Sequence, residues 1–121
     1  MTPLTVPSED YLERIYELLG ERGYARVTDI AERLQVKPAS VTRMLQKLEG
    51  AGYLNRVAYR GFSLTEKGKT VGRKIKKRHQ VLAAFLKKLG VPTRVIKHDI
   101  EGLEHHLSDQ TLKKLELFIT S

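Results

Sequence analysis

Cysteine is absent from the sequence, and this absence limits both how the chain is stabilised and how it can bind a metal. No disulfide can form, and any metal site must use carboxylates, imidazoles or other oxygen and nitrogen donors instead of thiolates. The first seven residues also lack the basic and apolar regions of a signal peptide. We therefore expect a cytoplasmic protein.

Long apolar runs are missing as well, and no stretch approaches the ~20 apolar residues of a membrane-spanning helix. The sequence shows no internal repeat, no nucleophile motif and no glycine-rich phosphate loop. What it does contain is positive charge, with 22 Lys and Arg against 14 Asp and Glu, a net charge of +8. A basic chain of 121 residues favours a polyanionic partner, most often nucleic acid.

The first half of the chain predicts a helix-turn-helix. Apolar residues at helical spacing predict helices over 9–21, 29–34 and 38–49. We expect residues 1–7 to form an extended arm, and Ser8 and Thr28 to cap the first two helices. The last two helices are short and joined by a tight turn, which is typical of a helix-turn-helix.

A β-hairpin is predicted directly after these helices. Two short extended segments, 53–57 and 61–64, flank a turn that carries Arg60. A hairpin in this position makes the unit a winged helix, with Arg56 and Arg60 placed to touch DNA phosphates. The order of the elements therefore indicates DNA binding more strongly than the net charge does.

The second half of the chain is predicted to be helical. Thr65 is expected to cap a long helix over 66–89, which is basic in its first half and apolar in its second and so suggests a linker helix. A further helix begins near Thr93, with Leu103 and Leu107 on its apolar stripe, and Ser108 caps a last one. Three helices cannot bury this much Leu and Phe alone, so we expect dimerisation.

The predicted fold class is therefore mainly α: an N-terminal winged helix-turn-helix with a two-stranded wing, a long linker helix and a C-terminal helical dimerisation domain. We assign residues 1–65 to the DNA-binding domain and residues 66–121 to the second domain. Residues expected in the major groove are Ser40, Thr42, Arg43 and Gln46, with apolar contact to thymine methyl groups from Pro38 and Ala39. Residues expected on the DNA backbone are Lys47, Arg56 and Arg60.

An acidic and histidine-rich segment near the C-terminus is a candidate metal site. Glu101, Glu104 and His105 have the spacing i, i+3 and i+4, which puts two carboxylates and an imidazole on one face of a helix. A cation between them would relieve the repulsion of the two carboxylates, but a solvated polar helix face is an equally good interpretation. Elsewhere, Asp10 and Glu13 by themselves only complement a helix dipole, and a lone His79 is usually a surface or packing residue.

Several segments together resemble the manganese-responsive branch of the diphtheria toxin repressor family of metal-dependent transcriptional repressors. The segments that carry the resemblance are SEDYLE (8–13), ARVTDIA (25–31), SVTRMLQKL (40–48), RH (78–79) and EGLEHHL (101–107). The resemblance covers nearly the whole chain. It implies a homodimeric winged-helix repressor that binds operator DNA when loaded with metal, and it implies that the protein is not an enzyme.

The resemblance also implies a ligand set and a mechanism. The branch's metal ligands match Asp10, Glu13, His79, Glu101, Glu104 and His105. Iron-responsive relatives have Met at the position of Asp10 and Cys at that of Glu101, and they carry a third C-terminal domain, so the manganese branch is expected. Four carboxylates balance two Mn(II) ions per subunit. Bound metal would staple the two domains together at their interface, favour operator binding and so repress manganese uptake genes.

Three alternatives remain open at this point. The protein could be a regulator of the same family that responds to iron or another divalent metal. It could be a binuclear metallohydrolase, because two-metal carboxylate sites hydrolyse phosphates and peptides, although the missing nucleophile motif argues against this. It could also be a metal-independent winged-helix regulator that senses an organic ligand.

Overall fold

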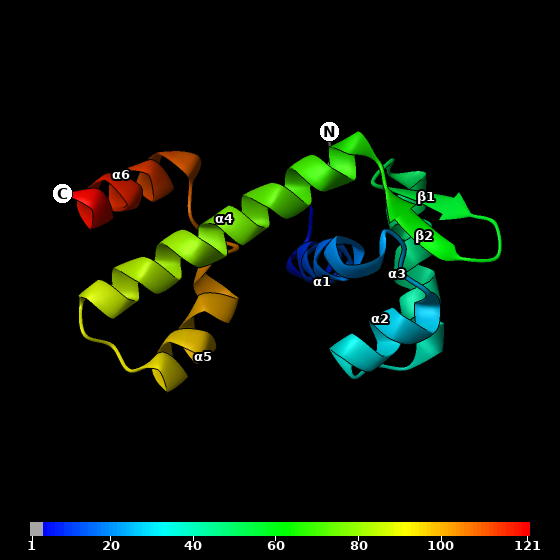
Figure 1. The fold of residues 1–121 in the computed structure, drawn as a ribbon, viewed down its shortest axis with the longest axis horizontal. Coiled ribbons are helices and arrows are strands. Elements are labelled where there is room, and N and C mark those ends of the chain that lie inside the picture. The colour runs from blue at the N-terminus through cyan, green and yellow to red at the C-terminus, as the bar shows by residue number, and fades with distance from the viewer. Residues whose placement is uncertain (1–3) are drawn as a thin grey trace. The chain divides into compact units, whose positions relative to one another are not determined.

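The computed structural model describes residues 4–121, which form two compact units divided between Arg73 and Lys74. We call them the N-terminal unit and the C-terminal unit. The elements of the described residues, in chain order (Figure 1), are α1 (Val6–Arg22), α2 (Val27–Leu34), α3 (Pro38–Gly50), β1 (Leu54–Val57), β2 (Gly61–Leu64), α4 (Glu66–Lys88), α5 (Thr93–Leu103) and α6 (Asp109–Thr120). The predicted mainly α fold with a two-stranded wing is confirmed.

Helix α1 begins earlier than the sequence predicts. Thr5 is its N-cap, and the Thr5 hydroxyl oxygen accepts a hydrogen bond from the Ser8 N–H at 3.2 Å. Pro7 lies in the first turn, where its missing N–H has no intrahelical partner to lose. The predicted arm is therefore wrong for residues 6 and 7, and Ser8 is not the cap. Residues 4 and 5 lie outside the helix, with Thr5 extended as the arm predicts, and residues 1–3 of the arm lie outside the described residues.

Helix α2 also begins two residues before its predicted start. Arg26, with extended backbone angles, is the N-cap in place of Thr28. The Asp29 carboxylate accepts a hydrogen bond from the Arg26 N–H at 3.3 Å, so an acidic group in the first turn binds the backbone before the helix. The chain then turns through Gln35, which has a left-handed φ of 57°, and enters α3 at Pro38 as predicted.

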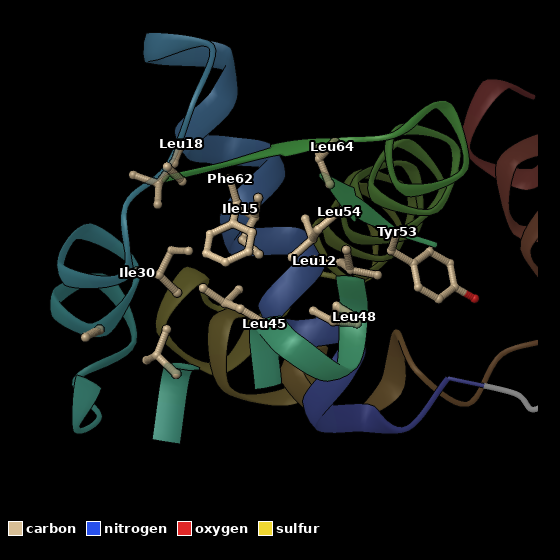
Figure 2. Close-up of a cluster of buried hydrophobic side chains, with 13 residues drawn as sticks. Leu12, Ile15, Leu18, Ile30, Leu45, Leu48, Tyr53, Leu54, Phe62 and Leu64 are labelled. Atoms are coloured by element: carbon tan, nitrogen blue, oxygen red, sulfur yellow. The ribbon is translucent and has the colours of Figure 1, made fainter. Parts of the chain in front are cut away.

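The core of the N-terminal unit joins helices α1, α2 and α3 to the hairpin (Figure 2). Leu12 and Ile15 of α1, Ile30 of α2 and Leu45 of α3 are fully buried. Each comes from one face of its helix, as the apolar spacing predicts. This core fixes α3, with its other faces exposed, relative to the two strands.

The wing is attached to the core through a third extended segment. In the hairpin, Leu54 lies opposite Leu64 and Val57 lies opposite Gly61. The Phe62 N–H donates to the Ala25 carbonyl at 2.8 Å, and the Ala25 N–H donates to the Phe62 carbonyl at 3.0 Å. Gly61 has a φ of 110°, and a Cβ there would collide with the Ala25 carbonyl oxygen. Only glycine permits this close approach.

The C-terminal unit packs α5 and α6 against the second half of α4. Its small core is centred on Leu82 of α4 with Ile96 and Ile100 of α5. Phe85 of α4 meets Phe118 of α6 edge to face, with ring centroids 5.8 Å apart. Within the described residues, no helix combines the length and the apolar character that a membrane span requires.

One predicted helix in this unit ends early. The sequence predicts a helix whose stripe runs to Leu107, but α5 ends at Leu103, which is 43% exposed instead of inward-facing. Residues 104–106 form a turn. The predicted cap of the last helix is confirmed, since the Ser108 hydroxyl oxygen accepts from the Thr111 N–H at 3.1 Å.

Candidate metal centre and nucleic-acid interface

The candidate metal segment lies where α5 gives way to the turn. Glu104 is the C-cap of α5, and its N–H still donates to the Ile100 carbonyl at 3.0 Å. Because the helix ends there, Glu101 lies on the last turn of α5 whereas Glu104 and His105 lie in the turn that follows. The prediction of one continuous helical face is therefore wrong, although the spacing does mark the segment that holds the donors.

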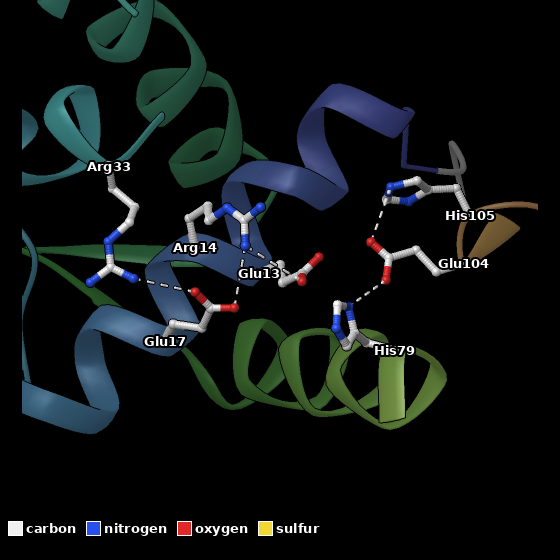
Figure 3. A network of polar contacts seen from close by, with 7 residues as sticks. All are labelled: Glu13, Arg14, Glu17, Arg33, His79, Glu104 and His105. Atoms are coloured by element: carbon white, nitrogen blue, oxygen red, sulfur yellow. Dashed lines mark hydrogen bonds and ion pairs between the residues drawn. The ribbon is translucent and has the colours of Figure 1, made fainter. Parts of the chain in front are cut away.

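Glu104 contacts two imidazoles (Figure 3). Its buried carboxylate, 4% exposed, has Oε2 3.2 Å from Nδ1 of His79 on α4 and Oε1 3.6 Å from Nε2 of His105. Neighbouring ligands of an octahedral ion with bonds of roughly 2.1–2.3 Å lie about 3.0–3.3 Å apart. The separation of Glu104 and His79 falls in this range, and that of Glu104 and His105 lies slightly above it. The donor set of carboxylate and imidazole therefore fits a divalent cation.

Arg78 holds the turn that carries these donors. Its Nη1 donates to the Glu104 carbonyl oxygen at 3.3 Å, and its Nη2 donates to Oδ1 of Asp109 at 3.1 Å. One guanidinium thus ties α4 to both the end of α5 and the start of α6. A fixed turn keeps the Glu104 carboxylate and the neighbouring imidazoles in register.

The other predicted metal ligands, Asp10, Glu13 and Glu101, lie on helices α1 and α5. Asp10 and Glu13 are three residues apart on α1, in the N-terminal unit. Oε1 of Glu13 lies 3.7 Å from Nη1 of Arg14, which belongs to a chain of ion pairs that continues through Glu17 (Figure 3). Glu101 is exposed on α5 in the C-terminal unit. Their role as ligands remains a prediction.

The predicted DNA-contact residues lie on the exposed side of α3 and on the wing. The exposed members of α3 are Pro38, Ala39, Ser40, Thr42, Arg43, Gln46 and Lys47. On β1, Arg56 is held in place, because its Nε lies 3.1 Å from Oε1 of Glu49 and its guanidinium stacks over the Phe62 ring at 5.3 Å. Arg60 is exposed in the turn at the tip. Arg56 is therefore positioned by the fold, whereas Arg60 projects from it.

A groove beside α3 has no counterpart in the sequence interpretation. Its volume is about 560 Å³, and its lining residues are Pro7, Tyr11, Ser40, Arg43, Met44 and Lys47. Burial raises the pKa of the Tyr11 phenol further above neutral pH, and the hydroxyl is a hydrogen-bond donor at the edge of the groove. Three of the lining residues are predicted DNA contacts, but only the fold brings the start of α1 beside them.

Comparison with known proteins identifies the family. Residues 3–62 match the family described as "Iron dependent repressor, N-terminal DNA binding domain", and residues 65–121 match "Iron dependent repressor, metal binding and dimerisation domain". The HTH-type transcriptional regulator MntR of Bacillus subtilis (strain 168) is 50% identical over 113 residues, which cover 93% of this chain and 80% of MntR. The chain belongs to the iron-dependent repressor family. MntR of Geobacillus thermodenitrificans is also 50% identical, over 92% of this chain and 79% of that protein.

Solved structures of repressor-family relatives share the fold. The metal-dependent transcriptional regulator MtsR superposes with a TM-score of 0.87 at 28% identity, and the manganese regulator SloR with 0.81 at 32% identity. Each match covers 99% of this chain, and this chain spans 55% of each of those two. The family assignment confirms the predicted class of the protein, a metal-responsive, DNA-binding transcriptional repressor, and its relatives are regulators and not enzymes.

Proposed function

We propose that this iron-dependent repressor family member responds to manganese and represses transcription by binding operator DNA as a homodimer. The observation that carries the proposal is the buried Glu104 carboxylate between His79 and His105, in a sequence 50% identical to MntR. Oxygen and imidazole donors without thiolate suit manganese. Since affinity alone would favour later transition metals, selectivity must arise from geometry and from metal availability. Its place of action is the cytoplasm.

The proposed stoichiometry is two Mn(II) ions per subunit. The proposed ligands are Asp10, Glu13, His79, Glu101, Glu104 and His105. The four carboxylates in this set carry a charge of −4, which two divalent ions balance. This charge balance supports a binuclear centre.

The mechanism follows from how the donors are distributed along the chain. We assign residues 1–65 to DNA binding and 66–121 to metal binding and dimerisation, a division supported by family matches that end at 62 and begin at 65. Asp10 and Glu13 then belong to the first domain and the other proposed ligands to the second. Metal bound by both sets restricts the arrangements of the two domains, and the bound metal raises DNA affinity by favouring the productive one.

The dimer sets the geometry of the DNA target. Several large apolar side chains of the C-terminal unit are exposed, including Leu89, Leu117 and Phe118 at 58%, 60% and 49%, which supports their burial against a second subunit. Two recognition helices α3 in one dimer would read half-sites one helical turn apart, about 34 Å. Bound metal would stabilise that spacing.

A DNA-binding titration in different metals tests the proposal. A duplex selected by the protein from a random library in Mn(II) is the probe, and binding is compared in Mn(II), Fe(II), Zn(II) and chelator. We expect tight binding in Mn(II) and weak binding in chelator. Equal binding in chelator would refute metal dependence and favour a regulator that senses an organic ligand.

The alternative within the family is a response to iron or another divalent metal, which the family description itself favours. Asp10→Met tests it, because a thioether disfavours manganese relative to softer ions. We expect the variant to bind DNA better in Fe(II) or Co(II), relative to Mn(II), than the wild type does. An unchanged order of metals would exclude Asp10 as a ligand.

A further inference from the structure

We infer that Tyr59, at the tip of the wing, is a DNA-contact residue whose ring packs against the sugar–phosphate edge of the groove beside the one that α3 reads. The inference rests on the proposed DNA binding and adds a contact to it. Two features of Tyr59 carry it: a backbone conformation that tyrosine disfavours, and a side chain that the fold does not use.

The backbone of Tyr59 is in the left-handed region, with a φ of 65°. The Arg60 N–H donates to the Val57 carbonyl at 3.1 Å, which closes a four-residue turn with Tyr59 at its third position. A positive φ at that position is normally supplied by glycine or asparagine, because a Cβ is strained there. Tyrosine is therefore a costly choice for this turn.

The side chain of Tyr59 does not stabilise the fold by packing. Tyr59 is 102% exposed, so its ring is as open to water as in an extended peptide. Aromatic rings normally stabilise a fold because they bury a large apolar area, and the Tyr59 ring buries none within the N-terminal unit. A residue that strains the backbone without packing is expected where a partner uses it.

The position of the tip points to DNA as that partner. β1 packs beside α3, to which it is tied by the ion pair between Arg56 and Glu49. From buried Leu54 to Val57 the strand extends about 10 Å, close to the ~12 Å width of the major groove. With α3 in the major groove, the tip of the wing lies at the sugar–phosphate edge of that groove. The exposed Arg60 beside Tyr59 supplies positive charge for the phosphates there.

Paired measurements of stability and DNA affinity test the inference on the full chain. Tyr59→Gly relieves the strained φ, so we expect its melting temperature to be unchanged or raised by up to about 4 °C. We expect its affinity for the duplex selected in Mn(II) to fall about fivefold or more, the loss typical of a contact residue. A gain in stability together with a loss in binding is not expected of a merely structural turn residue.

Two further variants identify the kind of contact. Tyr59→Phe keeps the ring and should bind within about twofold of the wild type. Arg60→Ala should reduce the slope of log K against log salt by about one, whereas the Tyr59→Gly loss should be the same at every salt concentration, because the phenol is uncharged. Ala58→Ser, in the same turn, is the matched control and should leave affinity unchanged.

Each contrary result has a defined meaning. Wild-type affinity in Tyr59→Gly would refute the inference while leaving the proposed function intact. A loss in Tyr59→Phe as large as that in Tyr59→Gly would refute the ring contact. A changed dimer dissociation constant in Tyr59→Gly without DNA would assign the ring to a protein interface instead. If the wild type selects no duplex in Mn(II), both the proposed function and this inference fail.

Discussion

The substitution Glu104→Gln tests the candidate metal centre at its most connected residue. Glutamine preserves the size of the side chain, but it removes the negative charge and replaces one of the two oxygen donors by an amide N–H₂ group that cannot bind a cation. Both oxygens of Glu104 face an imidazole, at 3.2 Å and 3.6 Å, so the change alters both contacts. We therefore expect the Mn(II) affinity to fall at least 100-fold, since loss of a group that merely supports a ligand already costs 10–100-fold.

The expected signal can be calculated by linkage. At a free Mn(II) concentration about 100 times the wild-type Kd, binding stabilises the folded chain by roughly 2.7 kcal/mol. For a chain of this size, about 1 kcal/mol raises Tm by roughly 3–5 °C, so the wild type should gain about 10 °C. A 100-fold higher Kd leaves only about 0.4 kcal/mol, or 1–2 °C. Without metal, the variant should be at least as stable as the wild type, because it no longer buries a carboxylate.

Thermal unfolding monitored by circular dichroism, in Mn(II) and in chelator and at one protein concentration, provides the measurement. Glu66→Gln is the matched control, because it makes the same chemical change at a carboxylate whose side chain is 88% exposed. The control should keep the full gain in Tm. If Glu104→Gln also kept it, Glu104 would not be a ligand and the metal centre would have to be sought elsewhere.

Four further predictions concern the fold and the DNA interface. Leu45→Ala removes a fully buried side chain and should lower the free energy of unfolding in urea by about 2–5 kcal/mol. Gly61→Ala should cost at least ~2 kcal/mol in the same assay, because the new Cβ meets the Ala25 backbone. Lys88→Met removes a donor 3.0 Å from the Phe118 carbonyl and should increase amide hydrogen exchange in α6 about fivefold. Gln46→Ala should change the base preference in a library selection while leaving the salt slope unaltered.

The architecture of the N-terminal unit was predictable because its signals are local. Proline is tolerated in the first turn of a helix but not in its interior, and α3 begins at Pro38. The two strands lie within one residue of their predicted bounds, since turn residues separate two short apolar segments. The predicted caps of α1 and α2 are wrong for a physical reason. Several residues near each start can accept a backbone hydrogen bond, and only the packing of the helix decides which one does.

The end of α5 could not be predicted from local signals. No glycine or proline follows Leu103 before the next helix, so no local stop signal interrupts the helical pattern. The structure ends the helix through distant partners: Arg78 of α4 binds the Glu104 carbonyl, and Ser108 takes an extended conformation to cap α6. A contact between residues 26 positions apart cannot be predicted from the spacing of apolar residues.

The same long-range contact explains why His79 was ambiguous in the sequence. Alone on a basic helix it has no neighbour that suggests chemistry, and only the fold brings it to Glu104, 25 positions away. Arg78, the residue before it, fixes the turn on which Glu104 lies. Two adjacent residues of α4 thus have different roles: Arg78 holds the turn, and His79 contacts the Glu104 carboxylate. Substitutions at Arg78 and His79 should therefore both weaken metal binding, but only Arg78 substitutions should also loosen the start of α6, through the lost contact with Asp109.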